Sequence, residues 1–235
     1  MKLIQVRTEE ELGRYAADIF SKEIEMNQSL VMGLATGSTP LPLYRELIRR
    51  YEEGTLDFSN VRSVNLDEYV GLPRTHDQSY RFFMEENLFR HINIDPDNTH
   101  LPNGVAEDPE TECERYDTLI DQIGGIDLQL LGIGLNGHIG FNEPADSFSS
   151  HTQMVRLTES TIQANARFFA DPADVPKYAF TLDIRHIMLA KKIVLVAGSN
   201  KKDILDRAMH GDITPQVPAS ALQMHREITV IFAEE

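Results

Sequence analysis

A glycine-rich segment carries the densest group of side chains that could move a proton. Residues 132–144 are GIGLNGHIGFNEP, which places His138 and Glu143 five residues apart and the amide of Asn136 among the glycines. An imidazole titrates near neutral pH, and a nearby carboxylate can hold it in one tautomer. A single histidine with a single glutamate lacks the ligand set of a catalytic zinc, so we expect no metal here. The alternative is a loop that only shapes the edge of a sheet.

Two acidic residues follow a short apolar run at 61–66. Asp67 and Glu68 are neighbours, and neighbouring side chains at the end of a strand diverge, so one of them should face the crevice at the sheet edge. A carboxylate in that position can act as a general base or bind a metal. Capping the N terminus of a helix is the alternative role.

A third segment, TGSTP at 36–40, follows the apolar run 30–35 and offers donors for an anion. Gly37 allows a tight turn, and Ser38 and Thr39 carry hydroxyl groups. Pro40 suits the first turn of a helix, whose free N–H groups and positive dipole end would then face a bound phosphate. An ordinary turn between a strand and a helix is the alternative, because the Walker pattern and its lysine are absent.

Short apolar runs and longer amphipathic stretches alternate along the chain and would position these segments. The runs predict strands at 30–35, 61–66, 126–133, 177–182, 193–197 and 228–232, and the periodicity predicts helices at 9–26, 40–53, 79–91, 109–123, 159–170 and 201–210. Thr8 and Glu11 form a capping box for the first helix. The alternation predicts an α/β fold: a doubly wound, mostly parallel sheet with helices on both faces, as a single domain over 1–235. Ligands of such folds bind where the strands end, which is where all three segments lie.

The composition excludes several classes of partner. The chain has 22 Lys and Arg against 37 Asp and Glu, a formal charge of −15, so most of its surface should repel nucleic acid and anionic membranes. No apolar run approaches the roughly 20 residues of a membrane span, and the N terminus has no apolar leader, so we expect a cytoplasmic protein. The lone Cys113 lies among carboxylates, which should make its thiol unreactive.

Together these segments resemble the glucosamine-6-phosphate deaminase family, the glucosamine/galactosamine-6-phosphate isomerases. The likeness runs in order over nearly the whole chain and includes LATGSTP at 34–40, NLDEYVGL at 65–72, the segment 132–144, ANARFF at 164–169, VPKYA at 175–179 and ASALQMH at 219–225. The resemblance implies a Rossmann-like fold. It also implies conversion of glucosamine 6-phosphate to fructose 6-phosphate and ammonia, with no metal and no cofactor.

The resemblance implies a role for each candidate catalytic residue. His138 would open the sugar ring, assisted by Asn136 and Glu143. Several long family members carry Asp in place of Asn136, and an amide cannot raise the basicity of an imidazole, so we expect Glu143 to be the principal ionic partner of His138. Asp67 would remove the proton from C2 and return it at C1, and Glu68 would be structural.

The resemblance also assigns the phosphate site. Gly37, Ser38 and Thr39 would donate hydrogen bonds, and Arg167 and Lys201 would supply the cations that an acidic protein must place locally. Without the resemblance, either cation would be expected to be solvated. Residues 159–177 are expected to form a lid that excludes water.

The chain departs from the family pattern after the strand at 177–182. The usual glycine-rich turn is replaced by Asp183, Ile184 and Arg185. If that turn needs a positive φ, Asp183 would adopt it at a cost, and its charge near the sugar phosphate would lower substrate affinity. We expect His186 to be a surface residue.

A second departure concerns regulation. Regulated hexameric members carry Ser, Arg and Lys for an activator's phosphate at the positions of Asp146, Gln153 and Val155. This chain has an acid and two neutral residues there, and it ends at Glu235, short of the C-terminal extension of those members. We therefore expect an unregulated enzyme that is a monomer or a weak homo-oligomer.

Two other functions remain open. A 6-phosphogluconolactonase-type hydrolase would attack a lactone with water and needs no base at C2, so the role of Asp67 separates it from a deaminase. A non-catalytic sugar-phosphate sensor, such as the effector domain of a transcriptional regulator, would carry an N-terminal helix-turn-helix, and the predicted sheet begins by about residue 30.

Overall fold

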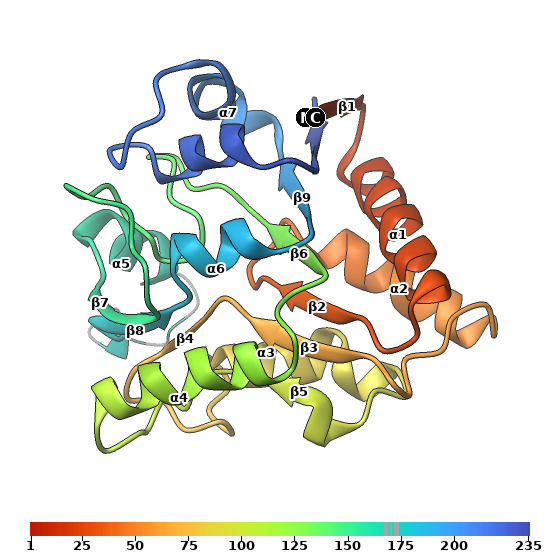
Figure 1. The fold of residues 1–235 in the computed structure, drawn as a ribbon, viewed down its shortest axis with the longest axis horizontal. Coiled ribbons are helices and arrows are strands. Elements are labelled where there is room, and N and C mark those ends of the chain that lie inside the picture. Colours follow the sequence, from red (N-terminus) through yellow and green to blue (C-terminus); the bar gives the residue numbers. More distant parts are fainter. Residues whose placement is uncertain (167–168, 170, 172–173) are drawn as a thin grey trace.

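The computed structural model describes residues 1–166, 169, 171 and 174–235 (Figure 1). Its strands are β1 (Lys2–Val6), β2 (Val31–Leu34), β3 (Arg62–Asn65), β4 (Asp67–Tyr69), β5 (Thr99–His100), β6 (Leu128–Leu131), β7 (Gln153–Arg156), β8 (Tyr178–Thr181), β9 (Lys192–Ala197) and β10 (Ile228–Ala233). Its α-helices are α1 (Glu9–Met26), α2 (Leu41–Glu52), α3 (Tyr80–Asn87), α4 (Pro109–Gln122), α5 (Glu159–Ala166), α6 (Ile184–Leu189) and α7 (Lys202–His210). Short 3-10 helices are η1 (Phe89–His91), η2 (Pro96–Asn98), η4 (Ser199–Lys201) and η5 (Pro218–Met224).

The main sheet has seven strands in the order β1-β10-β9-β6-β2-β3-β5, and every pairing in it is parallel. This confirms the predicted α/β fold with a parallel sheet. All four residues of β2 and all four of β6 are buried, as expected for strands covered on both faces. Because the strands are parallel, the loops that follow β2, β3, β6 and β9 emerge at the same edge.

A second, antiparallel sheet was not predicted. It contains β4, β8 and β7 in that order, and Asp67 pairs with Thr181 on β8. The predicted strand at 177–182 therefore exists as β8 but lies outside the main sheet. Its residues are apolar enough for a buried strand, and such a pattern does not specify the partner or its direction. In Figure 1 this sheet and α5 lie on the opposite side of the molecule from α1 and α2.

Local signals set several helix ends. The Thr8 hydroxyl accepts from Glu11 N at 3.2 Å, which confirms Thr8 as the N-cap of α1, whereas Glu11 Oε2 accepts from Arg7 N at 2.8 Å rather than from the N–H of Thr8 as in a standard capping box. Asp108 caps α4, whose first residue is Pro109. The predicted helix at 79–91 is interrupted at Leu88, where α3 gives way to η1. The predicted helix at 159–170 is observed as α5 to Ala166, and residues 167–168 and 170 lie outside the described part of the chain.

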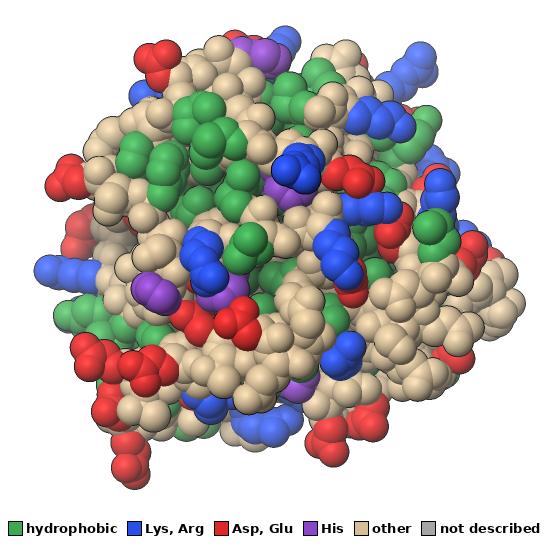
Figure 2. Space-filling view, in the orientation of Figure 1, with side chains coloured by type: hydrophobic (Ala, Val, Ile, Leu, Met, Phe, Trp, Pro, Cys, Tyr) green, Lys and Arg blue, Asp and Glu red, His purple; other side chains and the backbone are tan. Residues whose placement is uncertain are grey.

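One hydrophobic core joins the main sheet to the helices beside it. From α1 and α2 it includes Leu12, Phe20, Tyr44 and Leu47, each fully buried. Cys113 is also buried; burial, and then the charges of Asp117 and Glu112, raise the pKa of its thiol to about 11, which confirms that it is a poor nucleophile. No helix among the described residues is long and apolar enough to cross a bilayer. On the face drawn in Figure 2, acidic and basic side chains are interspersed, and no broad basic patch is visible.

Candidate active site

The three predicted segments meet at the carboxyl edge of the main sheet. Leu66 N donates to Leu34 O at 3.1 Å, which aligns the end of β3 with the end of β2. An ideal Cβ on Gly140 would lie 3.6 Å from Asp67 Oδ2, so the glycine-rich segment passes directly beside that carboxylate. The structure therefore brings Asp67 and the segment of His138 together, as the sequence predicted.

His138 is oriented by a short relay of side chains. Its Nδ1 lies 2.7 Å from Asn136 Oδ1 and 3.5 Å from Glu143 Oε2. The amide nitrogen of Asn136 donates to Glu143 Oε2 at 2.6 Å, which fixes the amide with its oxygen toward the ring. This network assigns the proton to Nδ1 and leaves Nε2 as a proton acceptor. Glu143 is thus the carboxylate beside His138, and Asn136 is the direct hydrogen-bond partner.

The glycines of this segment make room for the imidazole. A Cβ on Gly134 would lie 2.1 Å from a ring atom of His138, so no larger residue fits without displacing the ring. Gly140 has φ of +56°, and a Cβ there would lie 3.0 Å from Thr181 Oγ1. The glycine-rich segment does more than shape the sheet edge, because its backbone at Gly134 packs directly against the ring of His138 and so positions it.

Glu143 remains ionised well below neutral pH. Burial alone would raise its pKa, but its contacts with His138, Thr161 and Asn136 hold the pKa at about 2. A fixed negative charge next to His138 favours the protonated imidazole that forms when the ring accepts a proton. Neither Thr161, on α5, nor Thr158, just before that helix, was identified from the sequence, because their position beside Glu143 depends on long-range packing.

Asp67 is buried and titrates far from its usual range. Its side chain is 6% exposed, and within the described residues Oδ1 has no hydrogen-bond partner. Burial, reinforced by the charge of Glu68, raises the pKa of Asp67 to about 8. A carboxylate with a free oxygen and a raised pKa is suited to take a proton from a carbon acid.

Glu68 has a structural role, as expected. Its carboxylate accepts from the backbone N–H groups of Tyr69, Tyr80 and Arg81, each at 2.8 Å. Tyr80 and Arg81 are the first residues of α3, so Glu68 stabilises the N terminus of that helix. Ser79 is the N-cap of α3, since its hydroxyl accepts from Phe82 N at 3.1 Å, and Glu68 adds a charge that binds the N–H groups of the first two helical residues.

The phosphate segment has the predicted backbone shape. Gly37 has φ of +96°, Gly37 and Ser38 are exposed, and α2 begins after Pro40 without a side-chain cap on its N terminus. At this helix start Leu41 N donates to Ser38 O at 3.2 Å, and Pro40 and Pro42 have no N–H group, so an anion here would depend mainly on the donors of residues 37–39. Lys201, in η4 after β9, is half-buried, and burial lowers its pKa. Arg167 lies outside the described residues, as does part of the expected lid at 159–177.

The turn after β8 needs no positive φ at Asp183, and the expectation that His186 is a surface residue was wrong. Asp183 has φ of −77° and caps α6, and no residue other than glycine has a positive φ in the part of the chain described. Asp183 is fully buried and accepts from His186 N at 3.0 Å. His186 is 4% exposed rather than on the surface. Ile184, Ile187 and Met188 are spaced as on one face of a helix, but α6 has only six residues, which is too short a window for the sequence to predict it.

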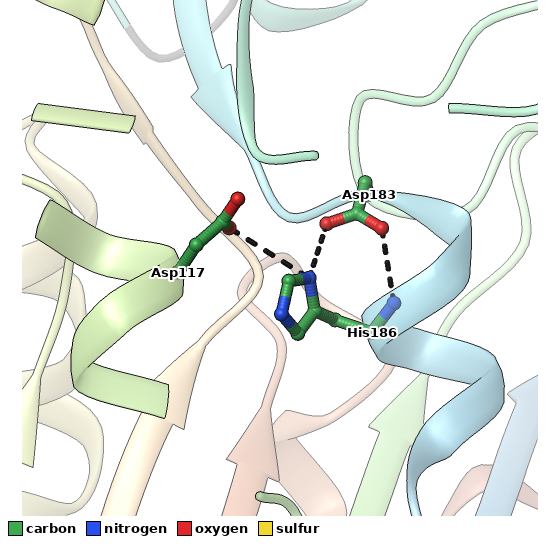
Figure 3. Close-up of side chains that lie close together, drawn as sticks. All are labelled: Asp117, Asp183 and His186. Atoms are coloured by element: carbon green, nitrogen blue, oxygen red, sulfur yellow. Dashed lines mark hydrogen bonds and ion pairs between the residues drawn. The ribbon is translucent and has the colours of Figure 1, made fainter. Parts of the chain in front are cut away.

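Figure 3 shows how His186 is held. Its Nδ1 contacts a carboxylate oxygen of Asp183 and lies 3.7 Å from Asp117 Oδ1 on α4. Within the described residues these three form the one group with metal-ligand spacing. The direct hydrogen bond from Nδ1 to Asp183 places a proton where a metal would bind, so we interpret the group as an ion-paired clamp between α4 and α6.

A cavity lies beside Glu143. Two of the residues that line it, Gln153 and Val155, stand at the positions where regulated family members bind the phosphate of an activator. The cavity has a volume of about 230 Å³, and its lining includes Glu143, Gln153, Val155 and Arg156. Gln153 and Val155 are neutral, as the sequence comparison noted, but Arg156 contributes a cation. The expected absence of regulation stays a prediction.

The comparisons with known proteins agree with this geometry. The family model described as glucosamine-6-phosphate isomerases/6-phosphogluconolactonase matches residues 5–231. A relative from Lachnoclostridium phytofermentans, named glucosamine-6-phosphate deaminase, is 57% identical over 236 residues and covers all of both chains. A relative of the same name from Clostridium perfringens is 54% identical, covering all of this chain and 98% of the relative.

Two solved structures illustrate a close and a distant similarity to this chain. A monomeric glucosamine-6-phosphate deaminase superposes with a TM-score of 0.97 at 45% identity, covering 100% of this chain and 98% of that one. The 6-phosphogluconolactonase of Thermotoga maritima has a TM-score of 0.78 at 19% identity, covering 99% and 98%, and shares the fold alone. Because the family model matches almost the full length of the chain, the chain belongs to the family of glucosamine-6-phosphate isomerases and 6-phosphogluconolactonases.

Proposed function

We propose that the chain is a glucosamine-6-phosphate deaminase, which converts glucosamine 6-phosphate and water to fructose 6-phosphate and ammonia. The observation that carries the proposal is the buried Asp67, which has one carboxylate oxygen without a hydrogen-bond partner among the described residues and lies beside the segment that orients His138. Full-length relatives that bear this name at 54–57% identity support it.

Ring opening is the first task. His138 Nε2 accepts the proton of the anomeric hydroxyl, and the same proton is then available for the ring oxygen as the C1–O5 bond breaks. Asn136 keeps Nδ1 as the donor, and Glu143 stabilises the imidazolium that exists between the two transfers. The result is an open-chain amino aldehyde with its carbonyl at C1.

Isomerisation follows at C2. The ammonium on C2 and the carbonyl at C1 both acidify the C2 proton, which Asp67 removes; one proton passes from the ammonium to the C1 oxygen, and the product is a 1,2-enolamine. The protonated Asp67 returns a proton to C1, and the imine now at C2 is hydrolysed by water, which releases ammonia. The raised pKa of Asp67 makes it a stronger base for this carbon acid than an ordinary carboxylate.

The phosphate is assigned to the start of α2. Backbone N–H groups and hydroxyls of Gly37, Ser38 and Thr39 would donate to its oxygens, and Lys201 and Arg167 would neutralise its charge. We further propose that the reaction needs no metal, and that the protein acts in amino-sugar breakdown in the cytoplasm as a monomer or weak homo-oligomer.

The test is to supply two substrates in the presence of a metal chelator. With glucosamine 6-phosphate, ammonia and fructose 6-phosphate should form in equal amounts. With 6-phosphogluconolactone, hydrolysis should not exceed the uncatalysed rate. Lactone hydrolysis without ammonia release would favour the alternative hydrolase, and binding of glucosamine 6-phosphate without turnover would favour a sensor.

A further inference from the structure

The carboxylate of Glu143 connects two separate parts of the fold. Its Oε2 receives the Asn136 amide at 2.6 Å and lies 3.5 Å from His138 Nδ1. Its Oε1 receives the hydroxyl of Thr161 at 2.6 Å. Thr161 is on α5, whereas the other three residues belong to the segment after β6. One charged group therefore joins α5 to the side chains that orient the histidine.

The start of α5 places the Thr161 hydroxyl for this contact. The hydroxyl of Thr158, just before the helix, accepts from Thr161 N at 3.3 Å and lies 2.9 Å from Thr161 Oγ1 and 3.4 Å from Glu143 Oε1. Its single proton has the shorter contact to Thr161, whose own proton is given to Glu143 at 2.6 Å, so Thr161 is the stronger donor to the carboxylate. Thr161 is 8% exposed, so its bond to the carboxylate is shielded from water and is correspondingly strong.

Regular structure does not fix the side chain of Glu143. The residue lies in an irregular loop, three residues after Gly140, where its backbone N–H donates to Phe141 O at 3.0 Å. Its carboxylate can rotate about the side-chain bonds unless donors hold it. Thr161 holds one oxygen, and this directs the other toward Asn136 and His138.

We propose that Thr161 is a positioning residue for the deamination, and that its hydroxyl makes ring opening by His138 depend on the docking of α5. The inference rests on the proposed function and deepens it. When α5 is docked, Glu143 is fixed where it stabilises the imidazolium. When α5 is displaced, the carboxylate is released, and the proton transfer at the sugar ring slows. Thr161 itself touches no reacting atom.

The first test compares three variants for kcat and KM. Thr161→Val removes the hydroxyl and keeps the shape, and it should lower kcat roughly tenfold with little change in KM, because a hydrogen bond to a charge is lost. Thr161→Ser should restore most of the rate. The control is Thr152→Val: Thr152 is 4% exposed, and its hydroxyl has no hydrogen-bond partner within the described residues. Wild-type kcat in Thr161→Val, or an equal loss in the control, would overturn the proposal.

The second test asks whether Thr161 acts through Glu143. In a Glu143→Gln background, Thr161→Val should cause little further loss of kcat, because the charged acceptor is already gone. If the loss of kcat in the double variant equals the product of the losses in the two single variants, Thr161 acts independently of Glu143 and the proposal is overturned.

A third measurement does not depend on turnover. Glu143→Gln should increase deuterium uptake by backbone amides of residues 159–166 several-fold relative to wild type, because the coupling between Glu143 and α5 is reciprocal. Unchanged uptake would overturn the coupling. If the wild-type protein releases no ammonia, the proposed function fails, and this exchange measurement still decides whether Glu143 and α5 are coupled.

Discussion

The side-chain amide of Asn136 donates to Glu143 Oε2 at 2.6 Å and thereby stands between that carboxylate and the imidazole of His138. An amide transmits orientation but carries no charge, so the negative charge that supports His138 acts from 3.5 Å rather than through a direct hydrogen bond. The expectation that Glu143 would be the ionic partner is consistent with this distance. The sequence did not predict that the amide would be the direct partner.

Replacing Asn136 should alter the pH dependence of turnover. Asn136→Asp places a carboxylate against Nδ1, which favours the imidazolium, so the acid limb of kcat/KM, which also contains the ionisation of Asp67, should move to higher pH. Asn136→Ala removes the relay and should lower kcat roughly tenfold without that upward movement. The measurement is the pH profile of both variants beside wild type. An unmoved acid limb in Asn136→Asp would contradict the assigned relay.

The fold was predictable where local patterns and the overall architecture agree. The Val- and Ile-rich run at 193–197 matches β9, and the N-cap signal at Thr8 matches the start of α1. β1 was missed because Leu3 is 52% exposed and the strand lies at the edge of the sheet, so it has no buried-strand pattern. The antiparallel partners of β8 were missed because pairing is a long-range property.

The candidate site was predictable where the chemistry lies within one segment. Asn136, His138 and Glu143 are neighbours in the sequence and in the structure. Thr161 reaches Glu143 from 18 residues away, and the sequence offered no signal for it. His186 was misplaced on the surface because the sequence does not reveal that Asp183 and, from α4, Asp117 will lie against its ring.

Lys201 should contribute to phosphate binding, and its neighbour provides a matched control. Lys201 is half-buried at the end of η4, whereas Lys202 is exposed on α7. Lys201→Met should raise KM for glucosamine 6-phosphate about tenfold or more with a smaller effect on kcat, because a charge-assisted contact is lost. Lys202→Met should behave as wild type. In Lys201→Met, inorganic phosphate should also compete less well with the substrate. Equal increases in KM in Lys201→Met and Lys202→Met would contradict the assignment of Lys201 to the phosphate site.

The His186 clamp should make stability depend on pH. Burial alone would lower the pKa of His186, but the hydrogen bond and charge of Asp183, with the charge of Asp117, raise it above its ordinary value of 6.5. Its stabilising contribution is therefore complete below about pH 6.5 and is lost as pH rises through the folded-state pKa.

The measurement is the melting temperature of His186→Asn relative to wild type across this range. The melting temperature of His186→Asn should lie further below that of wild type at pH 6 than at pH 9. His210→Asn is the control, because His210 pairs with Asp206 at an exposed position and should contribute little. A deficit that does not change with pH would mean that His186 stabilises the fold by packing rather than by charge.

The burial of the Asp67 carboxyl group should lower the stability of the folded protein at neutral pH. Burial raises its pKa to about 8 from the ordinary 3.8, so between these values the folded protein holds a proton that the unfolded chain has released. Stability conferred by this group consequently falls as pH rises from about 4 to 8. Asp67→Asn is neutral throughout and should melt a few degrees higher than wild type at pH 8, with the difference shrinking toward pH 4. A lower melting temperature at pH 8 would contradict the burial of an unpaired carboxylate.

The central claim is that the carboxylate of Asp67 moves the C2 proton, and the most direct measurement is the rate of ammonia release from glucosamine 6-phosphate by Asp67→Asn. The account predicts that wild type releases ammonia and fructose 6-phosphate in equal amounts. The variant should lose at least about a hundredfold in kcat, because a general base is removed. It should still bind inorganic phosphate as wild type does. Undiminished ammonia release by a correctly folded Asp67→Asn protein would contradict the claim.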